Sequence, residues 1–356
     1  MRRFMMDGHK LMYHPDRVAE FMETGDCFPL YVEISPVGSC NHRCLFCAYD
    51  YIGHPNRRLD GNRTLTLIDE LAECGVRSIL FAGEGEPLLH PDLGRMVGRC
   101  RERGIDAGLF TNGQLLSEEL AETILPSLLF VRFSFNGGSA ENYAAIHQVS
   151  TRVFNQVVGR IEQAVQIRER QKLNVDLGAQ FVLLPENLDF VFEAASRLKS
   201  AGIDYFVVKP FVQQSEQQGY QLKEPLPLLR LESVFSRLEE LNDRDFSVVI
   251  RRNAFEGYGQ RNYSHCLGTS FITAINSGGD VASCLPYWDR PEFVYGNIQN
   301  TSFTEIWHGE NRKRIKQHIE EELEVCRVCP PNCRPHAINE YLSEIRWPTA
   351  KHVNFV

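Results

Sequence analysis

The segment Ser39–Cys47 reads SCNHRCLFC and places three cysteines, Cys40, Cys44 and Cys47, within eight positions of one short loop. Thiolates are preferred ligands of iron–sulfur clusters and zinc, and three so close together can hold three corners of one cubane cluster. A structural zinc site closes with four protein ligands, so three cysteines alone favour a cluster with one open iron. Zinc, a ferredoxin-type cluster and buried structural cysteines stay as less favoured alternatives.

Composition bounds the class of protein. The 356 residues, 43% of them apolar, allow a full-sized core with room for one large and one smaller domain. The net charge of −8 and the scattered Lys and Arg argue against nucleic acid as a partner. We find no apolar run of about eighteen residues, as a membrane span requires, and no signal peptide in Met1–Asp7. We therefore expect a cytoplasmic protein without a membrane partner, in which clustered cysteines bind metal or clusters instead of forming disulfides.

Beyond residue 30 the sequence alternates between expected strands and expected helices. Strands are expected at Tyr31–Ser35, Val76–Ala82, Asp106–Phe110, Leu129–Phe135, Val175–Leu183 and Tyr205–Lys209. Helices are expected at Thr66–Cys74, Pro91–Arg103, after Ser117, around Val153–Val165 and at Asp189–Ser200. A period of about thirty residues is typical of parallel β/α units. These six units are too few to close an eight-fold barrel, so we predict an α/β fold with a partial (β/α)6 TIM-like barrel.

Polar turns follow the predicted strands, at Cys40–Cys47, Gly83–Pro87, Thr111–Gly113 and Asn136–Gly138. Because the carboxyl ends of parallel strands share one edge, we expect the site there. Residues 212–230 are rich in Gln and Pro, which is typical of a linker, and Phe271–Cys284 reads as a hairpin. The expected division is an amino-terminal extension at 1–30, the barrel at 31–211, a linker and helix at 212–245, a small α+β domain at 246–345 and a tail at 346–356.

The cysteine spacing of three and then two residues, with Phe46 before the last cysteine, resembles the signature of the radical S-adenosylmethionine (SAM) superfamily. The turn Gly83–Pro87 resembles its Gly-Gly-Glu-Pro motif, although Glu84 stands where the family more often has glycine. The resemblance implies that the open iron binds SAM and that Glu86 accepts a hydrogen bond from the SAM ammonium. The candidate SAM contacts are Phe46, Gly85, Glu86, Pro87, Asn112, Ser134, Asn136 and Gln180, with Arg132 and Lys209 as possible substrate or SAM contacts.

The carboxyl-terminal cysteines form a second group. Cys266 and Cys284 are separated by seventeen residues, and Cys326, Cys329 and Cys333 follow with two and then three residues between them. This spacing resembles a SPASM/twitch auxiliary-cluster domain. Two auxiliary clusters would need about seven or eight cysteines, so the five here imply one [4Fe–4S] cluster and two in the whole chain. We assign it to Cys266, Cys284, Cys326 and Cys329; Cys333 either replaces one of them or stays a free thiol. A zinc ribbon is the alternative.

The other cysteines and most histidines carry no predicted chemistry. Cys27, Cys74 and Cys100 are expected to pack in the core, and His14, His42, His90 and His147 are expected to be structural or exposed to solvent.

The resemblance implies an enzyme that reductively cleaves SAM to a 5′-deoxyadenosyl radical, which abstracts hydrogen from a small molecule of sugar, aminocyclitol or nucleoside type. The auxiliary cluster would then take up an electron, giving oxidation, or a thiol would return hydrogen, giving epimerisation. An electron donor such as flavodoxin or ferredoxin is implied as a partner. The alternatives are a peptide- or protein-modifying maturase and a non-catalytic iron–sulfur or zinc sensor or scaffold.

Overall fold

One continuous sheet organises the chain. The computed structural model describes residues 4, 8–214, 217, 219–222, 226 and 228–355. Within them, ten strands are hydrogen-bonded in the order β10-β9-β8-β1-β2-β3-β4-β5-β6-β7. The strands are β1 (Tyr31–Ile34), β2 (Ser78–Phe81), β3 (Asp106–Thr111), β4 (Phe130–Ser134), β5 (Asp176–Leu183), β6 (Tyr205–Pro210), β7 (Ser247–Ile250), β8 (Ile272–Ile275), β9 (Asp280–Ala282) and β10 (Val294–Asn297). Strands β1 to β7 and β8 run parallel, and β9 and β10 are antiparallel additions.

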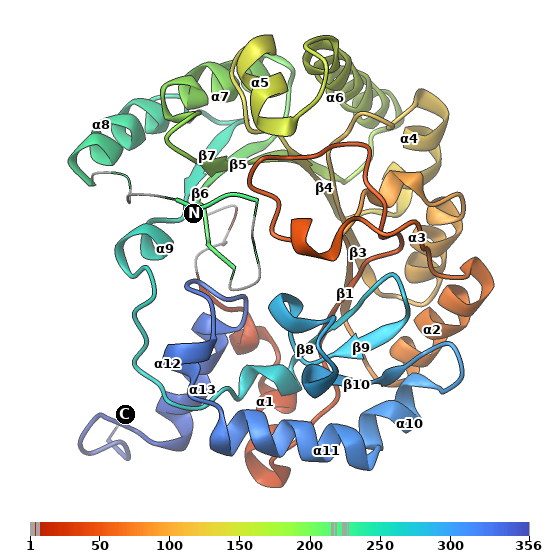
Figure 1. Cartoon of the computed structure of the whole chain (residues 1–356), viewed down its shortest axis with the longest axis vertical. Coiled ribbons are helices and arrows are strands. Elements are labelled where there is room, and N and C mark those ends of the chain that lie inside the picture. Colours follow the sequence, from red (N-terminus) through yellow and green to blue (C-terminus); the bar gives the residue numbers. More distant parts are fainter. Residues whose placement is uncertain are drawn as a thin grey trace.

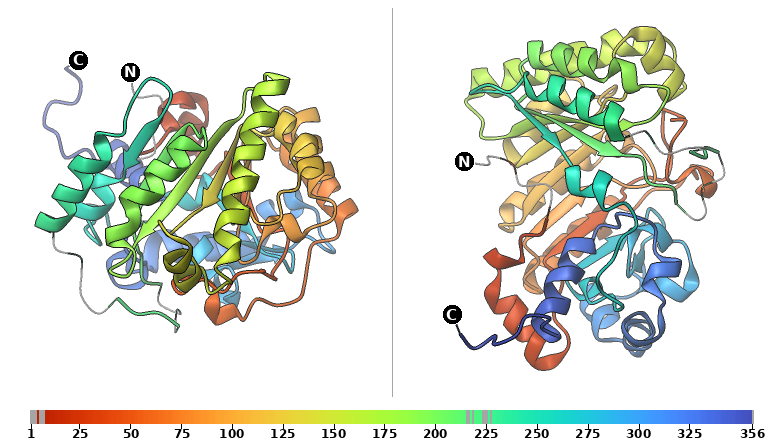
Figure 2. Two further views of the ribbon diagram at one scale, coloured as in Figure 1. Left: turned by 90° about the horizontal axis from the view of Figure 1, so that it is seen from above. Right: turned by 90° about the vertical axis from the view of Figure 1, so that its left-hand side faces the viewer.

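Helices cover the outer side of this curved sheet (Figure 1). Those around the barrel are α2 (Gly61–Glu73), α3 (Leu93–Glu102), α4 (Glu118–Ile124), α5 (Ala140–His147), α6 (Arg152–Gln171), α7 (Val191–Ser200) and α8 (Leu228–Glu239). The others are α1 (Pro15–Thr24), α9 (Arg252–Glu256), α10 (Phe303–His308), α11 (Glu310–Gln317), α12 (Val325–Val328) and α13 (His336–Arg346). Figure 2 shows α1 beside the carboxyl-terminal helices. No helix in the described ranges has the length and apolarity to cross a membrane.

Side chains alternate along each strand, so that one face of the sheet is apolar and the other is polar. On β4, Val131 and Phe133 are fully buried and pack in the main core, which also contains Val157 of α6. Between them, Arg132 and Ser134 are only partly buried. Successive residues of a strand point to opposite faces, so these polar side chains line the interior of the barrel. The same rule places Glu33 of β1 inside the barrel, because its neighbours Val32 and Ile34 belong to the core.

The predicted strands each have a counterpart, and the partial barrel is confirmed as a mixed α/β fold with a carboxyl-terminal antiparallel region. One helix start was wrong. We predicted that Thr66 caps a helix at Thr66–Cys74, but α2 begins at Gly61 because the Asp60 side chain accepts a hydrogen bond from Arg63 N at 2.8 Å. Thr66 lies inside the helix, where its hydroxyl donates to Asn62 O at 3.2 Å. Aspartate is as good a cap as threonine, and the earlier one starts the helix.

The sheet also crosses the expected boundary at residue 246. Strand β7 pairs with β6 of the barrel, and β8 pairs with β1 in parallel. The predicted hairpin at Phe271–Cys284 is present as β8 and β9, with Gly279 at φ +89° in its turn. An unpaired edge strand leaves backbone groups without partners, so β8 completes the hydrogen bonding of β1. The carboxyl-terminal part is therefore built onto the barrel sheet.

Candidate functional site

The three cysteines of the first loop converge at the carboxyl end of β1. The loop is fixed to the end of α5, because Arg43 N donates to His147 O at 3.2 Å and Leu45 N donates to Ile146 O at 2.8 Å. Burial raises the pKa of Cys44 well above its ordinary value, and the nearby Cys47 and Cys40 raise it further. Three partly buried thiols close enough to raise one another's pKa fit a [4Fe–4S] cluster, because metal binding removes their protons and neutralises the charge.

His147, which we predicted to be structural or exposed to solvent, lies against this site and is fully buried. The backbone N–H of Asn136 donates to His147 Nε2 at 3.2 Å. That contact makes Nε2 an acceptor, so the ring proton of the neutral imidazole is on Nδ1. His147 Nδ1 lies 3.2 Å from Cys44 Sγ, and the N–H therefore points a hydrogen bond at this sulfur. Burial keeps the imidazole neutral, because it lowers the pKa of His147 well below its usual value.

A neighbouring histidine raises the alternative of a metal site. The ligand atoms of His42, Cys44 and His147 all lie within 4.8 Å of one another. His42 Nε2 lies 2.9 Å from the Gln114 side-chain oxygen and must donate to it, so His42 Nδ1 is an acceptor, 3.4 Å from His147 Nδ1. The proton on His147 Nδ1 is therefore shared between two acceptors, Cys44 Sγ and His42 Nδ1. A protonated ring nitrogen has no lone pair for a metal, and the trio is consistent with a hydrogen-bond network around Cys44.

The turn at Gly83–Pro87 packs directly on the cysteine loop. Glu86 N donates to Ser39 O at 3.0 Å. A Cβ added at Gly85 would lie 2.3 Å from the carbonyl oxygens of both Val37 and Ser39, so only glycine fits there. The sequence motif thus brings the two loops into backbone contact.

The side chain of Glu86 holds this turn on β3. Its carboxylate accepts hydrogen bonds from Thr111 Oγ1 at 2.6 Å, Asn112 N at 2.8 Å and Leu88 N at 3.1 Å. Burial raises the pKa of Glu86 to about 7, against the lowering effect of these donors. Both carboxylate oxygens are directed at protein donors, so Glu86 positions the loops; its contact with the SAM ammonium stays a prediction.

Glu84, the residue that departs from the family motif, connects the barrel to the carboxyl-terminal hairpin. It is 2% exposed, and its carboxylate accepts a hydrogen bond from Ser277 N at 2.8 Å. The other oxygen forms an ion pair with Arg57 at 3.3 Å, and Arg57 Nε donates to Ser277 Oγ at 2.8 Å. A glycine in place of Glu84 would remove this connection.

The remaining predicted SAM contacts divide into two groups. Asn112 and Asn136 are used by the protein: Asn112 Nδ2 donates to Asn41 Oδ1 at 2.8 Å, and Asn136 Oδ1 accepts from Val182 N at 2.7 Å. Ser134 and Gln180 are paired in register on β4 and β5 and partly buried, which leaves them as the better-placed candidates. Phe46 packs beside the small cluster of Ile146, Val182, Leu184, Phe211 and Tyr220, and Pro87 is buried at the start of its turn.

The second group of cysteines gathers around Cys284, and which four of its members hold a cluster stays a prediction. Burial raises the pKa of Cys284 well above its ordinary value, and the neighbouring Cys266, Cys329 and Cys333 add to this. Cys326 is exposed. The structure therefore brings Cys333 into the group and leaves Cys326 at its edge. Three residues separate Cys329 from Cys333, and sequence spacing alone did not distinguish the two choices.

The surroundings of this second group fit a cluster. Burial raises the pKa of Cys266 to about 12. Asn339 Nδ2 donates to Cys266 Sγ at 3.4 Å, while its oxygen accepts from Gly268 N at 2.7 Å. Buried thiols with high pKa values are inert unless a metal ion removes their protons.

Comparison with known proteins agrees with the arrangement of these loops. The profile of the radical SAM superfamily matches residues 34–211. The chain belongs to the radical SAM superfamily. A second profile, that of the SPASM iron-sulfur cluster-binding domain, matches residues 266–330. Membership of this superfamily identifies a radical SAM [4Fe–4S] cluster and SAM as the cofactors.

Relatives of this radical SAM enzyme carry names that describe different products. An AdoMet-dependent heme synthase of Methanosarcina barkeri is 24% identical over 331 residues, which cover 86% of this chain and 92% of the relative. A PqqA peptide cyclase of Granulibacter bethesdensis is 23% identical and covers 82% of this chain and 76% of the relative. A third curated relative is matched over only about half (53%) of the relative's own length.

A solved structure shares the fold. SuiB of Streptococcus suis bound to S-adenosylmethionine superposes with a TM-score of 0.68 at 17% identity, over 87% of this chain and 72% of that one. The agreement extends beyond the barrel, because the matched part exceeds the barrel's share of the chain.

Proposed function

We propose that this radical SAM enzyme oxidises or epimerises a small molecule, with the help of one auxiliary cluster. The observation that carries the proposal is an ion pair that joins the segment after Cys333 to the barrel interior. Cys333 is followed by Arg334, whose guanidinium forms an ion pair with Glu33 of β1 at 2.7 Å. A substrate in the barrel would thus lie between the SAM-binding loop and the auxiliary cysteines.

The chain's own residues hold and shield the reaction. When bound, the cluster and SAM supply one-electron cleavage of SAM and hydrogen abstraction from the substrate. Cys40, Cys44 and Cys47 would hold the first cluster, and the Glu86 carboxylate keeps the loop at Gly83–Pro87 against it. Ser134 and Gln180 have the hydroxyl and amide that could bind the ribose of SAM.

For the auxiliary cluster we propose Cys266, Cys284, Cys329 and Cys333 as ligands. Cys266, Cys329 and Cys333 all raise the pKa of Cys284, whereas Cys326 influences only Cys329 among these four and is exposed, which supports this set over the one that sequence spacing suggested. Full ligation by four cysteines would leave this cluster without an open iron.

The test is anaerobic reconstitution with iron and sulfide, followed by dithionite and SAM. We expect 5′-deoxyadenosine and about eight irons per chain, falling to about four when Cys40, Cys44 and Cys47 are all changed to Ala. Cys74→Ala is a matched control, because this buried cysteine packs in the core. A wild-type protein that binds iron but makes no 5′-deoxyadenosine would contradict the proposal.

The similarity to PqqA peptide cyclase favours a second candidate, a peptide-modifying maturase. The two are separated by incubating the enzyme with deuterated metabolites and with deuterated candidate peptides. Deuterium in 5′-deoxyadenosine from a metabolite supports the small-molecule proposal, and deuterium only from a peptide supports the alternative.

A further inference from the structure

A set of hydrogen bonds joins the loop between Cys40 and Cys44 to the turn after β3 and to the end of α5. Its members are Asn41, His42, Asn112, Gln114 and His147. Three of them, His42, Asn112 and His147, are buried. At each end of the set lies a backbone N–H group, which can only donate, so the direction of every hydrogen bond between the two ends follows from these two groups.

The first end is the backbone N–H of Gln114, which donates to Asn112 Oδ1 at 3.0 Å. The nitrogen of the Asn112 amide therefore donates to Asn41 Oδ1 at 2.8 Å, and by the same rule the nitrogen of the Asn41 amide donates to Gln114 Oε1 at 2.9 Å. Gln114 Oε1 also lies 2.9 Å from His42 Nε2. Burial lowers the pKa of His42 below its usual value, which keeps the ring neutral. Because the Gln114 oxygen can only accept, the ring proton of His42 is on Nε2, and His42 Nδ1 is an acceptor.

The second end is the backbone N–H of Asn136, which donates to His147 Nε2 at 3.2 Å. Asn136 Oδ1 accepts from Val182 N at 2.7 Å, so the Asn136 amide nitrogen faces the same Nε2, at 3.3 Å. With two donors at Nε2, the proton of this neutral ring is on Nδ1. His147 Nδ1 lies 3.2 Å from Cys44 Sγ and 3.4 Å from His42 Nδ1, and both of these atoms accept.

Cys44 and His42 therefore share one N–H. A hydrogen shared between two acceptors forms a weaker bond to each of them than it would form to one alone. A hydrogen bond to a cluster sulfur stabilises the reduced, more negative state of the cluster and so raises its reduction potential. Because Gln114 holds the His42 proton on Nε2, His42 Nδ1 continues to accept, and the hydrogen bond to Cys44 stays weak.

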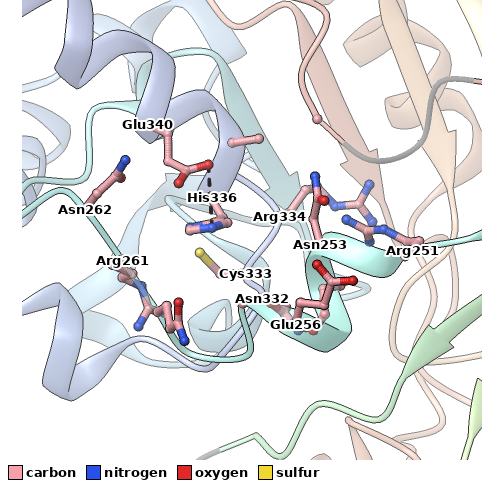
Figure 3. A pocket seen from close by; sticks show the side chains of 15 residues that line it. Arg251, Asn253, Glu256, Arg261, Asn262, Asn332, Cys333, Arg334, His336 and Glu340 are labelled. Atoms are coloured by element: carbon pink, nitrogen blue, oxygen red, sulfur yellow. Dashed lines mark hydrogen bonds and ion pairs between the residues drawn. The ribbon is translucent and has the colours of Figure 1, made fainter. Parts of the chain in front are cut away.

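The histidine beside the second cysteine group is arranged differently. A cavity of about 610 Å³ has Cys333, His336 and Glu340 among its lining residues. Figure 3 shows the ion pair between His336 and Glu340, in which His336 Nε2 lies 3.7 Å from the carboxylate. His336 Nδ1 lies 3.1 Å from the Tyr263 hydroxyl. Both ring nitrogens of His336 thus face oxygen atoms, and the second cysteine group can serve as an internal reference for an effect confined to the first.

We propose that His42 and Gln114 lower the reduction potential of the SAM-binding cluster, by drawing the His147 hydrogen bond partly away from Cys44. Both are positioning residues, because they act on the cluster through His147. The inference rests on the ligation of this cluster by Cys44, which is part of the proposed function, and it holds for a small-molecule substrate and for a peptide alike. A cluster of lower potential gives up its electron to SAM more readily. The two histidines should therefore have opposite effects: removing His147 lowers the potential, and removing His42 raises it.

The first measurement is an EPR-monitored redox titration of the reconstituted enzyme, in which the SAM-binding cluster is recognised by the change that SAM causes in its signal. His42→Phe removes the competing acceptor but keeps an aromatic ring and the backbone N–H that donates to Cys40 Sγ at 3.4 Å. We expect this variant to favour reduction of the SAM-binding cluster about threefold, or about 30 mV for one electron. The signal of the second cluster should not move.

The second measurement tests Gln114. ¹⁵N NMR of the histidine-labelled enzyme, with its clusters oxidised, shows which ring nitrogen of His42 carries the proton. Gln114→Leu removes the oxygen that holds this proton on Nε2. Part of the proton population should then move to Nδ1, and the potential should rise in the same direction as for His42→Phe. Gln156→Leu is the matched control, because the exposed Gln156 accepts from the Gln114 amide nitrogen at 3.3 Å and its loss leaves the Gln114 oxygen in place.

A potential that falls or stays unchanged in His42→Phe would overturn the proposal, and so would an equal shift of both clusters. The proposal also fails if His42 of the wild-type enzyme carries its proton on Nδ1. If the enzyme with Cys40, Cys44 and Cys47 all changed to Ala keeps the SAM-responsive signal, the proposed ligation fails and this inference fails with it. If that signal is lost but His42→Phe has the wild-type potential, only this inference fails.

Discussion

Replacing Glu84 tests whether the unusual residue of the SAM motif couples the barrel to the SPASM hairpin. Glu84→Ala removes the acceptor of the buried Ser277 N–H and the partner of Arg57. A hydrogen bond to a charged group contributes about 1.5–3 kcal/mol, and an unsatisfied buried N–H costs a similar amount. Because Ser277 can recover part of this by local adjustment, we expect the free energy of unfolding to fall by about 3 kcal/mol.

Glu84→Gln separates the two contributions. The amide keeps an oxygen for Ser277 N, but it loses the charge that faces Arg57, whose side chain is 39% exposed. Ion pairs with an exposed partner contribute only about 0–1 kcal/mol, so Gln should cost about 1 kcal/mol. Since Glu84 and the hairpin lie beside the SAM-binding loop, both variants should also weaken SAM binding, and Ala the more strongly.

The assay is urea unfolding under anaerobic conditions, followed by circular dichroism, with the SAM dissociation constant measured separately. Glu240→Ala is the matched control, because Glu240 is an exposed glutamate outside the site. An Ala variant within about 0.5 kcal/mol of wild type would refute the coupling. If Gln were as damaging as Ala, the ion pair with Arg57 would supply most of the stabilisation and the reasoning about Ser277 would be wrong.

Three further predictions concern the clusters and the amino-terminal segment. His147→Asn should lower the potential of the SAM-binding cluster by about 60 mV, because a hydrogen bond to its sulfur is lost; an unchanged potential in an EPR-monitored titration, with the exposed His352→Asn as control, would contradict this. Cys326→Ser should retain about eight irons and Cys333→Ser about four to five, and the opposite order in iron analysis would restore the assignment made from sequence. Burial acts to raise the pKa of Asp26, but the paired guanidinium of Arg312 holds that pKa below its ordinary value. The stability of the protein should therefore fall as the pH drops through the pKa of Asp26, and an Asp26→Asn variant should lose this acid sensitivity. Equal acid unfolding profiles for the two proteins would contradict the prediction.

The barrel could be predicted from the sequence because its signals are local. The strand at Val175–Leu183 carries its own run of β-branched and apolar residues, and the three-cysteine loop follows directly after another such run. Hydrophobic pattern and turn residues depend on neighbours only a few positions away. Strands β1 to β6 therefore appeared within a few residues of their expected places.

The site was less predictable because its contacts join residues far apart in the chain. His147 meets Cys44 across 103 positions, and Glu84 meets Ser277 across 193. Nothing in the local sequence shows that Asn136 N donates to His147, which is what fixes the ring proton. Likewise, Cys326 is exposed and Cys333 is partly buried, a difference that their spacing from Cys329 does not reveal. Such pairs become visible only when the sheet is assembled.

The continuity of the sheet indicates that the two cysteine groups belong to one folding unit. Three carboxylates on the amino-terminal side have partners on the carboxyl-terminal side: Glu84 with Ser277, Glu33 with Arg334, and Asp26 with Arg312. Taking a carboxylate out of water is costly, and removing its partner leaves the charge uncompensated. Glu33 is only 4% exposed and Glu84 only 2% exposed. Without the carboxyl-terminal part, both buried carboxylates would lose their partners, and β1 would become an unpaired edge strand. The carboxyl-terminal part is thus held to the barrel by charged contacts as well as by the continuous sheet.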